Sequence, residues 1–338
     1  MKYAPSLLFM ISTLTCFAQD ADPVPNRTPA DGPFIPAAAA PGGIVLPLYP
    51  PDSPFLKKER IHEAERYNTT GSSTGGKVQS TLNIHNPTIE VHLAHSDQQK
   101  TGTAIIVVPG GGHKILWVGP EGYDMVPLFA KYGVSTIVLR NRLRVDGYEP
   151  TTDAVNDAFQ AIRIVRSRAA EWKIDPAKIG IIGFSAGAEL SAPTALFFDD
   201  FAQKNSAASD PLGKISPRPD FVGVIYPGPT PFTKAPETPI PANVPPSFVA
   251  CAGSGDRVHA LWADDYFRAM LKASVPNLEM HIYGRGGHGG AVSPRGGTPY
   301  GTWHERFIEW FRDLGFLEQS GSETKAAKEV AEYAKKRK

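Results

Sequence analysis

The residues around Ser185 have types and spacing that suit nucleophilic chemistry. Residues 179–187 read Ile-Gly-Ile-Ile-Gly-Phe-Ser-Ala-Gly, an apolar run that leads into Gly-x-Ser-x-Gly. This pattern is typical of a nucleophile elbow, the sharp strand-to-helix turn that lifts a serine out of a sheet. Gly183 and Gly187 suit that turn because it brings the backbone before and after the serine close together.

Acyl transfer by a serine also needs a base and an acid that orients the base. Asp256 follows the apolar run 247–252, and His288 lies in a glycine-rich segment after the run 278–283. Serine, then aspartate, then histidine is the chain order that accompanies a nucleophile elbow. We therefore predict Ser185 as nucleophile, His288 as base and Asp256 as the acid.

A glycine run after the strand-like residues 104–108 could supply donors for an oxyanion. It reads Pro-Gly-Gly-Gly-His and ends at His113, and a run of this kind can turn bare backbone N–H groups toward a ligand. We predict the N–H groups of Gly111 and Gly112, with that of Ala186, as the donors. Each motif alone has another interpretation. A histidine between glycines is often only a loop residue, a glycine run can be a phosphate-binding turn, and an aspartate in a turn often caps the local backbone. Four motifs in the required order at successive strand ends favour catalysis.

No metal or cofactor is expected. His92 and His95 are three residues apart on one expected strand, with no cysteine or carboxylate partner expected nearby, which is a weak pattern for a metal site.

The composition indicates one large α/β domain with appendages. The chain has 338 residues, 41% of them hydrophobic and 20% charged, and its net charge is +1. That charge does not suggest a nucleic-acid partner, and no segment after the N-terminus has the length of a membrane span.

The N-terminus resembles an export signal. Residues 1–18 contain one positive charge, an apolar run and small residues before Gln19, which predicts a signal peptide and a secreted or periplasmic protein. Lipidation at Cys16 is the weaker alternative. Residues 19–80 are rich in Pro, Ala and Gly and are expected to form a leader and linker, residues 81–317 the catalytic domain, and residues 318–338 a charged tail.

Strands and helices are expected to alternate in the catalytic domain, as in an open, mostly parallel sheet with helices on both faces. The expected strands are the half-exposed 89–93, the buried 104–108, 134–139 and 247–252, and in addition 179–184, 221–226 and 278–283. The expected helices cover 122–132, 152–169 with Thr152 as cap, a short segment after the elbow, 263–273 and 303–314. Residues 227–246 form a proline-rich insertion that could overhang the site as a partial lid.

These motifs together resemble secreted bacterial α/β-hydrolases that are often labelled xylanase and are better described as carbohydrate esterases of the acetyl-xylan-esterase type. The resemblance covers about residues 84–317 and rests on 109–113, 139–143, 183–187, 256–258 and 281–289. It implies a catalytic Ser185, Asp256 and His288, and acylated plant or algal polysaccharide fragments as substrates.

The chain departs from the pattern of this family near the expected pocket. Relatives commonly continue the elbow as Gly-Gly-His, where this chain has Gly-Ala-Glu ending at Glu189, and they often have Tyr in place of Asn141 and His113. We therefore take His113 and Glu189 as candidate substrate-binding residues.

The expected function is an exported serine esterase that removes acyl, chiefly acetyl, groups from polysaccharide or oligosaccharide. The alternatives are a feruloyl or general carboxylesterase, a peptidase or amidase on the same fold, and an inactive hydrolase-fold binding protein. Glycosidase chemistry is not expected because no pair of carboxylates stands out.

The choice of Asp256 over its neighbours Asp264 and Asp265 can be tested by mutation. Asp256 follows a strand end, whereas the other two are expected in the following helix. Asp256→Asn should lower turnover by on the order of a thousandfold or more, because the base loses its orienting carboxylate. Asp264→Asn and Asp265→Asn should each change turnover by less than about tenfold. An active Asp256 variant beside an inactive Asp264 or Asp265 variant would identify a different acid.

Overall fold

The structure, a computed structural model, describes residues 32–70, 77–94, 101–206, 210–292 and 299–337. The expected signal peptide at 1–18, the first part of the leader and His95 lie outside the described residues. Within the described ranges, no helix combines the length and the hydropathy that a membrane crossing needs.

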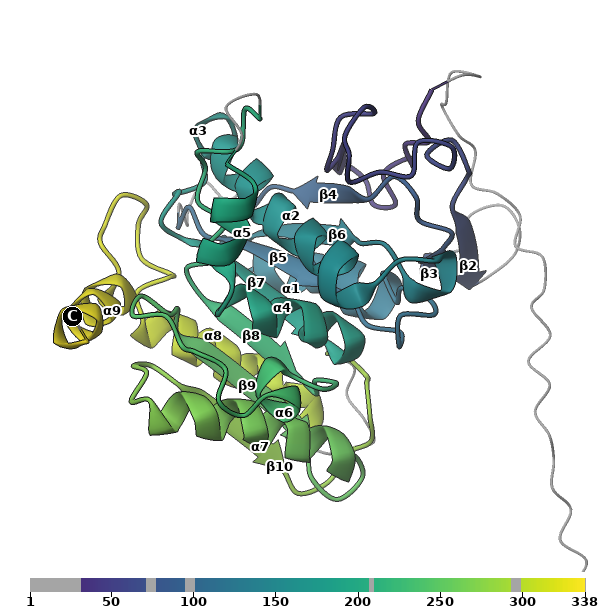
Figure 1. Cartoon of the computed structure of the whole chain (residues 1–338). Helices are drawn as coiled ribbons and strands as arrows, with labels where there is room; N and C mark the ends of the chain where they lie inside the picture. Colours follow the sequence, from purple (N-terminus) through teal and green to yellow (C-terminus); the bar gives the residue numbers. More distant parts are fainter. Residues whose placement is uncertain (1–31, 71–76, 95–100, 207–209, 293–298, 338) are drawn as a thin grey trace, which may run out of the picture.

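An eight-stranded sheet forms the centre of the molecule (Figure 1). Its strand order is β1-β4-β6-β5-β7-β8-β9-β10, and the neighbours from β6 to β10 pair in parallel. At one edge, β4 pairs antiparallel with both β6 and β1. The strands are β1 Ile44–Pro47, β4 Thr88–His92, β5 Ala104–Val108, β6 Ser135–Arg140, β7 Ile179–Phe184, β8 Val222–Ile225, β9 Ser247–Ala252 and β10 Glu279–Tyr283. The predicted α/β-hydrolase fold is confirmed.

The central strands are continuous apolar runs because helices cover both faces of the sheet. All residues of β5, β6, β7, β8 and β9 are buried. Figure 1 shows α2 and α4 in front of the sheet and α8 behind it. Behind it, α1 and α8 meet through Phe129 and Phe307, whose ring centroids are 6.0 Å apart.

The helices vary in length, and several begin with a tighter or wider turn. The α-helices are α1 Met125–Ala130, α2 Val155–Ser167, α3 Ala169–Trp172, α4 Ala188–Thr194, α5 Phe198–Lys204, α6 Pro231–Lys234, α7 Arg257–Lys272, α8 Trp303–Asp313 and α9 Lys325–Lys336. The short turns are η1 Gly119–Tyr123, η2 Arg144–Asp146, η3 Pro150–Ala154, η4 Ser185–Gly187 and η5 Pro299–Thr302.

The predicted starts of the first two helices need correction. The helix expected over 122–132 is divided between η1 and α1. Thr152 does not cap the next helix, because that helix is preceded by the wide turn η3. Glu149 caps η3 instead, and its side chain accepts a hydrogen bond from the N–H of Thr151 at 3.3 Å.

The predicted domain start at residue 81 comes too late. Strand β1 belongs to the main sheet, and β2 Arg66–Thr70 pairs with β3 Lys77–Leu82 in a second, two-stranded sheet. Leader residues also enter the core, among them Phe34, Leu48, Tyr49, Leu56 and Ile61. Pro, Ala and Gly are common between these apolar residues, and their abundance predicted a linker. The segment packs on the domain because the apolar residues themselves are buried.

Strand β4 was expected to be half-exposed, but all five of its residues are buried. The acidic residue in its middle, Glu90, is neutralised inside the fold. Its carboxylate accepts hydrogen bonds from Arg140 at 2.7 Å, from the Tyr123 hydroxyl at 2.9 Å and from the backbone N–H of Ala39 at 2.9 Å. Glu90 therefore fastens the leader to the sheet.

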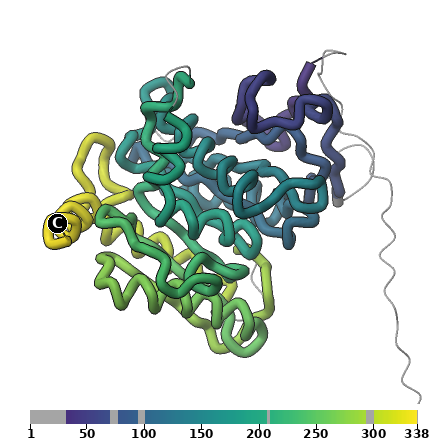
Figure 2. Tube along the Cα trace, in the orientation of Figure 1, coloured from purple at the N-terminus to yellow at the C-terminus, as the bar shows by residue number. Residues whose placement is uncertain are grey.

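The charged tail is a docked helix. On α9, Ala326, Val330 and Tyr333 are buried, and the Tyr333 hydroxyl donates to the carbonyl of Ala273 at 2.9 Å. The segment before α9 is held by Lys178, whose ammonium donates to the carbonyls of Glu318 at 3.0 Å and Gln319 at 3.1 Å. Figure 2 shows the two ends of the described chain on opposite sides of the molecule.

The Glu90 cluster makes a prediction about stability. Glu90→Ala removes the carboxylate that is hydrogen-bonded to buried Arg140 and leaves only Glu65, 4.0 Å away, so it should cost about 3–5 kcal/mol in the free energy of unfolding, measured with urea. The control is Glu309→Ala, which removes an exposed partner of Arg306 and should cost less than about 1 kcal/mol. Similar losses in the two variants would contradict the role of Glu90.

Candidate active site

The chain turns sharply at Ser185, where β7 ends and η4 begins. Ser185 has a φ of +53°, in the left-handed region that residues with a side chain rarely occupy. A Cβ on Gly183 would lie 2.2 Å from the carbonyl oxygen of Gly187, and a Cβ on Gly187 would lie 2.1 Å from that of Val108. The turn therefore requires glycine at both positions, as the Gly-x-Ser-x-Gly pattern predicts.

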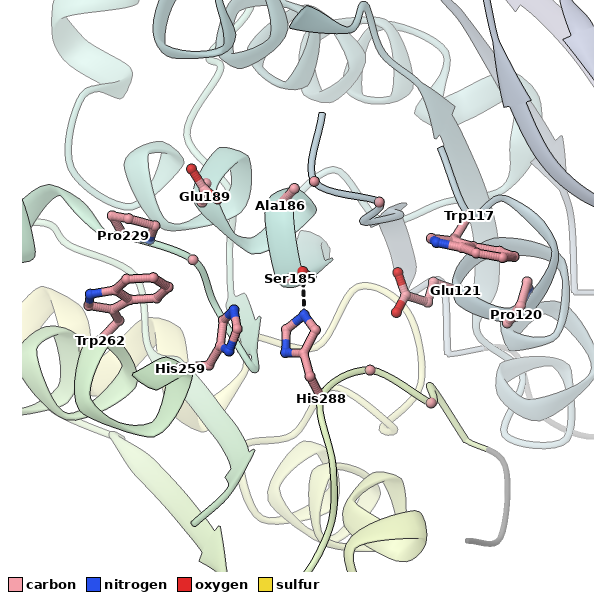
Figure 3. Close-up of a pocket in the computed structure, with 15 residues that line it drawn as sticks. Trp117, Pro120, Glu121, Ser185, Ala186, Glu189, Pro229, His259, Trp262 and His288 are labelled. Carbon is pink, nitrogen blue, oxygen red and sulfur yellow. Dashed lines mark hydrogen bonds between the residues drawn. The ribbon is translucent and has the colours of Figure 1, made fainter. Parts of the chain in front are cut away.

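Ser185, His288 and Asp256 form one chain of hydrogen bonds. The Ser185 Oγ is 2.8 Å from His288 Nε2, and His288 Nδ1 is 2.8 Å from Asp256 Oδ2 (Figure 3). A carboxylate can only accept, so the His288 proton lies on Nδ1 and Nε2 is left to accept the serine proton. The structure thus brings together the three residues chosen from the sequence.

Asp256 immediately precedes α7, yet its side chain does not cap that helix. Its side chain is only 4% exposed, and both of its oxygens face histidines. The helix begins at Arg257, six residues before the predicted start, so Asp264 and Asp265 are not in its first turn. Asp264 pairs with Arg268, and Asp265 accepts a hydrogen bond from Thr233 at 3.1 Å. The carboxylate beside His288 is that of Asp256.

The predicted oxyanion donors lie beside Ser185. Gly111 has a φ of +124° and Gly112 a φ of +63°, and both line the same cavity as Ser185 and Ala186. A Cβ on Gly111 would lie 2.1 Å from the carbonyl oxygen of Ile115, so only glycine fits there. Ala186 lies in the first turn of the helical segment after β7, where an N–H group has no partner within the helix.

A buried glutamate that the sequence analysis missed holds the glycine loop in place. Glu121 accepts hydrogen bonds from the N–H of Gly110 and from the hydroxyl of Tyr226, each at 2.8 Å. The Tyr226 oxygen in turn accepts from the N–H of Ala291 at 3.1 Å, three residues after His288. These three hydrogen bonds therefore connect the loop that contains Gly110 to the loop that contains His288. A glutamate four residues after a tryptophan gives no sequence signal for this role.

The cavity in front of Ser185 has a volume of about 830 Å³. Trp117, which is 40% exposed, and Trp262 lie on either side of the Ser185–His288 pair (Figure 3). Of the proline-rich insertion 227–246, Gly228 and Pro229 line the cavity.

The two candidate substrate-binding residues lie at different depths. Glu189 lines the cavity, whereas His113 is not among the lining residues and is only 4% exposed. His113 Nε2 lies 3.4 Å from Glu189 Oε2, so the histidine contacts the glutamate from behind. A direct substrate contact through His113 does not fit this structure, because the left-handed turn at His113, with φ +58°, takes the ring into the interior.

A second histidine, His259, stands beside the triad and was also missed. It lies in the first turn of α7, its Nδ1 is hydrogen-bonded to Asp256 Oδ1, and its ring lies parallel to that of His288 with centroids 3.7 Å apart. The spacing Asp-x-x-His at a helix start could have identified it, had the start of α7 been placed correctly.

Asp256, His259 and His288 offer ligand atoms within 4.8 Å of one another, among the residues that the structure describes. They are poorly arranged for a metal ion. Both Asp256 oxygens already accept hydrogen bonds, and the two stacked imidazoles direct their in-plane nitrogen lone pairs side by side rather than toward one point. His92 lies elsewhere, with its Nε2 3.2 Å from Glu90 Oε1.

Sequence comparisons connect the chain with esterases and xylanases. The family model described as BD-FAE matches residues 89–225. The acetylxylan esterase of Xylanibacter ruminicola is 27% identical over 256 residues, which are 70% of this chain and 49% of that protein. Endo-1,4-beta-xylanase B of Butyrivibrio fibrisolvens is 32% identical over 134 residues, 39% of this chain and 20% of that protein. The chain thus spans about half the length of the first relative and a fifth of the second.

Solved structures with the same fold include two esterases. The acetyl ester-xyloside bifunctional hydrolase from Caldicellulosiruptor lactoaceticus superposes with a TM-score of 0.59 at 26% identity, over 69% of this chain and 89% of that one. Esterase 2 of Thermogutta terrifontis superposes with a TM-score of 0.58 at 23% identity, over 76% of this chain and 95% of that one.

The close approach of Gly110 to the serine turn yields a prediction. In Gly110→Ala the new Cβ would lie 2.5 Å from the Phe184 carbonyl oxygen and 2.8 Å from the Ser185 Cβ, so the loop or the serine must move. Displacements of about 1 Å can cost about a hundredfold in rate, and we expect a loss of that order in kcat/KM on a soluble aryl ester. Gly284→Ala is the control, because its Cβ meets nothing within 4 Å, and it should change kcat/KM by less than about twofold. An unaffected Gly110 variant would show that the loop is not fixed in this way.

Proposed function

We propose that this chain, an α/β-hydrolase similar to the acetyl-xylan-esterase-like hydrolases, is a serine carboxylic-ester hydrolase that removes acyl groups, chiefly acetyl, from carbohydrate. The observation that carries the proposal is the hydrogen-bonded series from Ser185 through His288 to Asp256, which opens onto a cavity that Gly111, Gly112 and Ala186 also line. Nucleophile, base, acid and oxyanion donors are the groups that ester hydrolysis by a serine requires.

The chain's own residues account for each proton transfer. As Ser185 Oγ attacks the ester carbonyl carbon, its proton passes to His288 Nε2, and Asp256 stabilises the resulting imidazolium through Nδ1. The N–H groups of Gly111, Gly112 and Ala186 stabilise the oxyanion. His288 then gives the proton to the departing sugar oxygen, which releases the alcohol and leaves an acyl-Ser185. His288 Nε2 then takes a proton from water as the water oxygen attacks the acyl carbon, and it returns that proton to Ser185 Oγ as the Oγ–carbon bond breaks, which releases the carboxylic acid and restores Ser185.

Two observations support an acylated carbohydrate as the substrate. The relatives named above include an acetylxylan esterase and an acetyl ester-xyloside hydrolase. The cavity also has a tryptophan on each side of the serine, Trp117 before η1 and Trp262 on α7. Tryptophan combines a large apolar face with a polar N–H, which suits the apolar faces and hydroxyl rim of a sugar ring.

A feruloyl ester is the second candidate substrate, because the same tryptophans could stack on an aromatic acyl group. An inactive binding protein is less well supported, since the Ser185–His288 hydrogen bond is formed, and no observation at this site favours a peptidase. We further propose export, based on the sequence of residues 1–18.

Release of acetate and of ferulate from acylated xylan tests the proposal, with Ser185→Ala as the inactive control. Trp117→Ala should raise KM for acetylated xylo-oligosaccharides by about tenfold, which corresponds to the loss of about 1.4 kcal/mol of stacking, and change KM for p-nitrophenyl acetate by less than about twofold. Leu271→Ala, an exposed apolar residue near the far end of α7, should change neither. Equal effects of Trp117→Ala on both substrates would contradict a sugar-binding role, and release of acid by Ser185→Ala would contradict the nucleophile.

A further inference from the structure

Asp256 serves two histidines at once. Its Oδ2 faces His288 Nδ1 at 2.8 Å, and its Oδ1 is hydrogen-bonded to His259 Nδ1. The carboxylate is nearly buried, so each of its oxygens needs a donor. Any rotation that improved one contact would weaken the other. The position of Oδ2, and with it the orientation of His288, therefore depends on the contact with His259.

The rings of the two histidines are also in direct contact. Their centroids are 3.7 Å apart and their planes differ by 24° (Figure 3). The titratable groups that face His259 are Asp256 at the start of α7, His288 after β10 and Glu189 on α4. On its own helix, Trp262 packs edge-on against the ring at a centroid distance of 5.1 Å. His259 is thus enclosed by the catalytic base on one face and by tryptophan at the other side.

The contacts define which ring nitrogen of His259 carries the proton. With Asp256 as the acceptor, His259 donates from Nδ1, and its Nε2 is the nitrogen that binds a further proton. Burial lowers the pKa of His259, and although the hydrogen bond to Asp256 opposes this effect, the pKa stays below the usual imidazole range. His259 is therefore neutral at pH 7 and becomes charged only as the solution is made more acid.

We propose that His259 is a positioning residue that fixes Asp256 for His288, and that a proton on its Nε2 switches the triad off in acid. The inference rests on the proposed function, which makes His288 the base. A charged His259 lies against the ring that must itself become an imidazolium in the transition state, so the like charges raise the barrier. A charged His259 also pairs with the Asp256 carboxylate, which then stabilises the imidazolium of His288 less well.

The proposal predicts two protonations on the acid side of the pH profile rather than one. As the pH falls, the two contacting histidines take up two protons in two steps that belong to the pair, and each step lowers the rate. In the wild type, the slope of log rate against pH should rise from about one to about two at the acid end. His259→Gln can still donate an amide N–H to Asp256 but cannot bind the proton, so its slope should stay at about one.

The experiment measures the second-order rate constant for labelling of Ser185 by an alkyl fluorophosphonate from about pH 4.5 to about pH 8.5. This reaction needs an activated serine but no particular acyl substrate. At pH 8, His259→Gln should react within about threefold of wild type, whereas His259→Ala, which loses the donor, should react about tenfold or more slowly. Circular dichroism at each pH confirms that the proteins are folded. His281→Gln is the matched control, because His281 pairs with Glu279 on the edge strand β10, and it should keep the wild-type profile.

Three results would overturn the inference. A slope of about two in His259→Gln would place the second proton elsewhere, and a wild-type rate in His259→Ala at pH 8 would remove the positioning role. If the fluorophosphonate still labels Ser185 in the wild type, either result leaves the proposed esterase function intact. Failure of the wild type to react at any pH would overturn both, because Ser185 would then not be an activated nucleophile.

Discussion

The structure depends on the close approach of the Ser185 turn to the loop that follows β5. Strands β5 and β7 are neighbours in the sheet, and at their ends the two backbones meet almost without intervening side chains. Gly187 lies against the carbonyls of Val108 and Pro109, and Gly110 lies against that of Phe184. Because these two glycines permit the approach, main-chain contacts fix Ser185 close to the loop that contains Gly111 and Gly112. The cavity walls can then vary without disturbing the reacting atoms.

Buried charged side chains hold several loops in place through hydrogen bonds. Glu121 holds the N–H of Gly110, and Glu90 holds the N–H of Ala39, in both cases through a carboxylate that backbone and side-chain donors satisfy together. Arg142 is a third example, since it pairs with Asp157 at 2.7 Å and donates to the carbonyl of Phe55 at 2.6 Å. An unpaired charge in the interior is costly, so each of these loops is bound to one place by the group it satisfies.

Local patterns in the sequence predicted the parallel strands and the three residues that the structure brings together at Ser185, Asp256 and His288. Strands such as 104–108 and 247–252 are continuous apolar runs, and Ser185, Asp256 and His288 each follow one. What could not be predicted depends on distant pairing. The burial of β4 requires the side chain of Arg140, on the neighbouring strand β6, to pair with Glu90, and the packing of the leader requires sites for Phe34 and Leu48 that only the folded protein provides. His259 was missed because the helix start was placed six residues late, and His113 was misassigned because its left-handed backbone gives no sequence signal.

The triad is spread along the chain in a way that affects when activity can arise. Ser185 follows β7, Asp256 follows β9, and His288 follows β10, the last strand to be synthesised and the outermost in the parallel part of the sheet. A growing chain folds from its N-terminal end, so the serine turn can form while the base has not yet been made. A nascent or truncated product that stops before residue 288 therefore has a nucleophile without the means to activate it. Under the proposed function, hydrolytic activity therefore arises only after residue 288 has been added to the chain and β10 has joined the sheet.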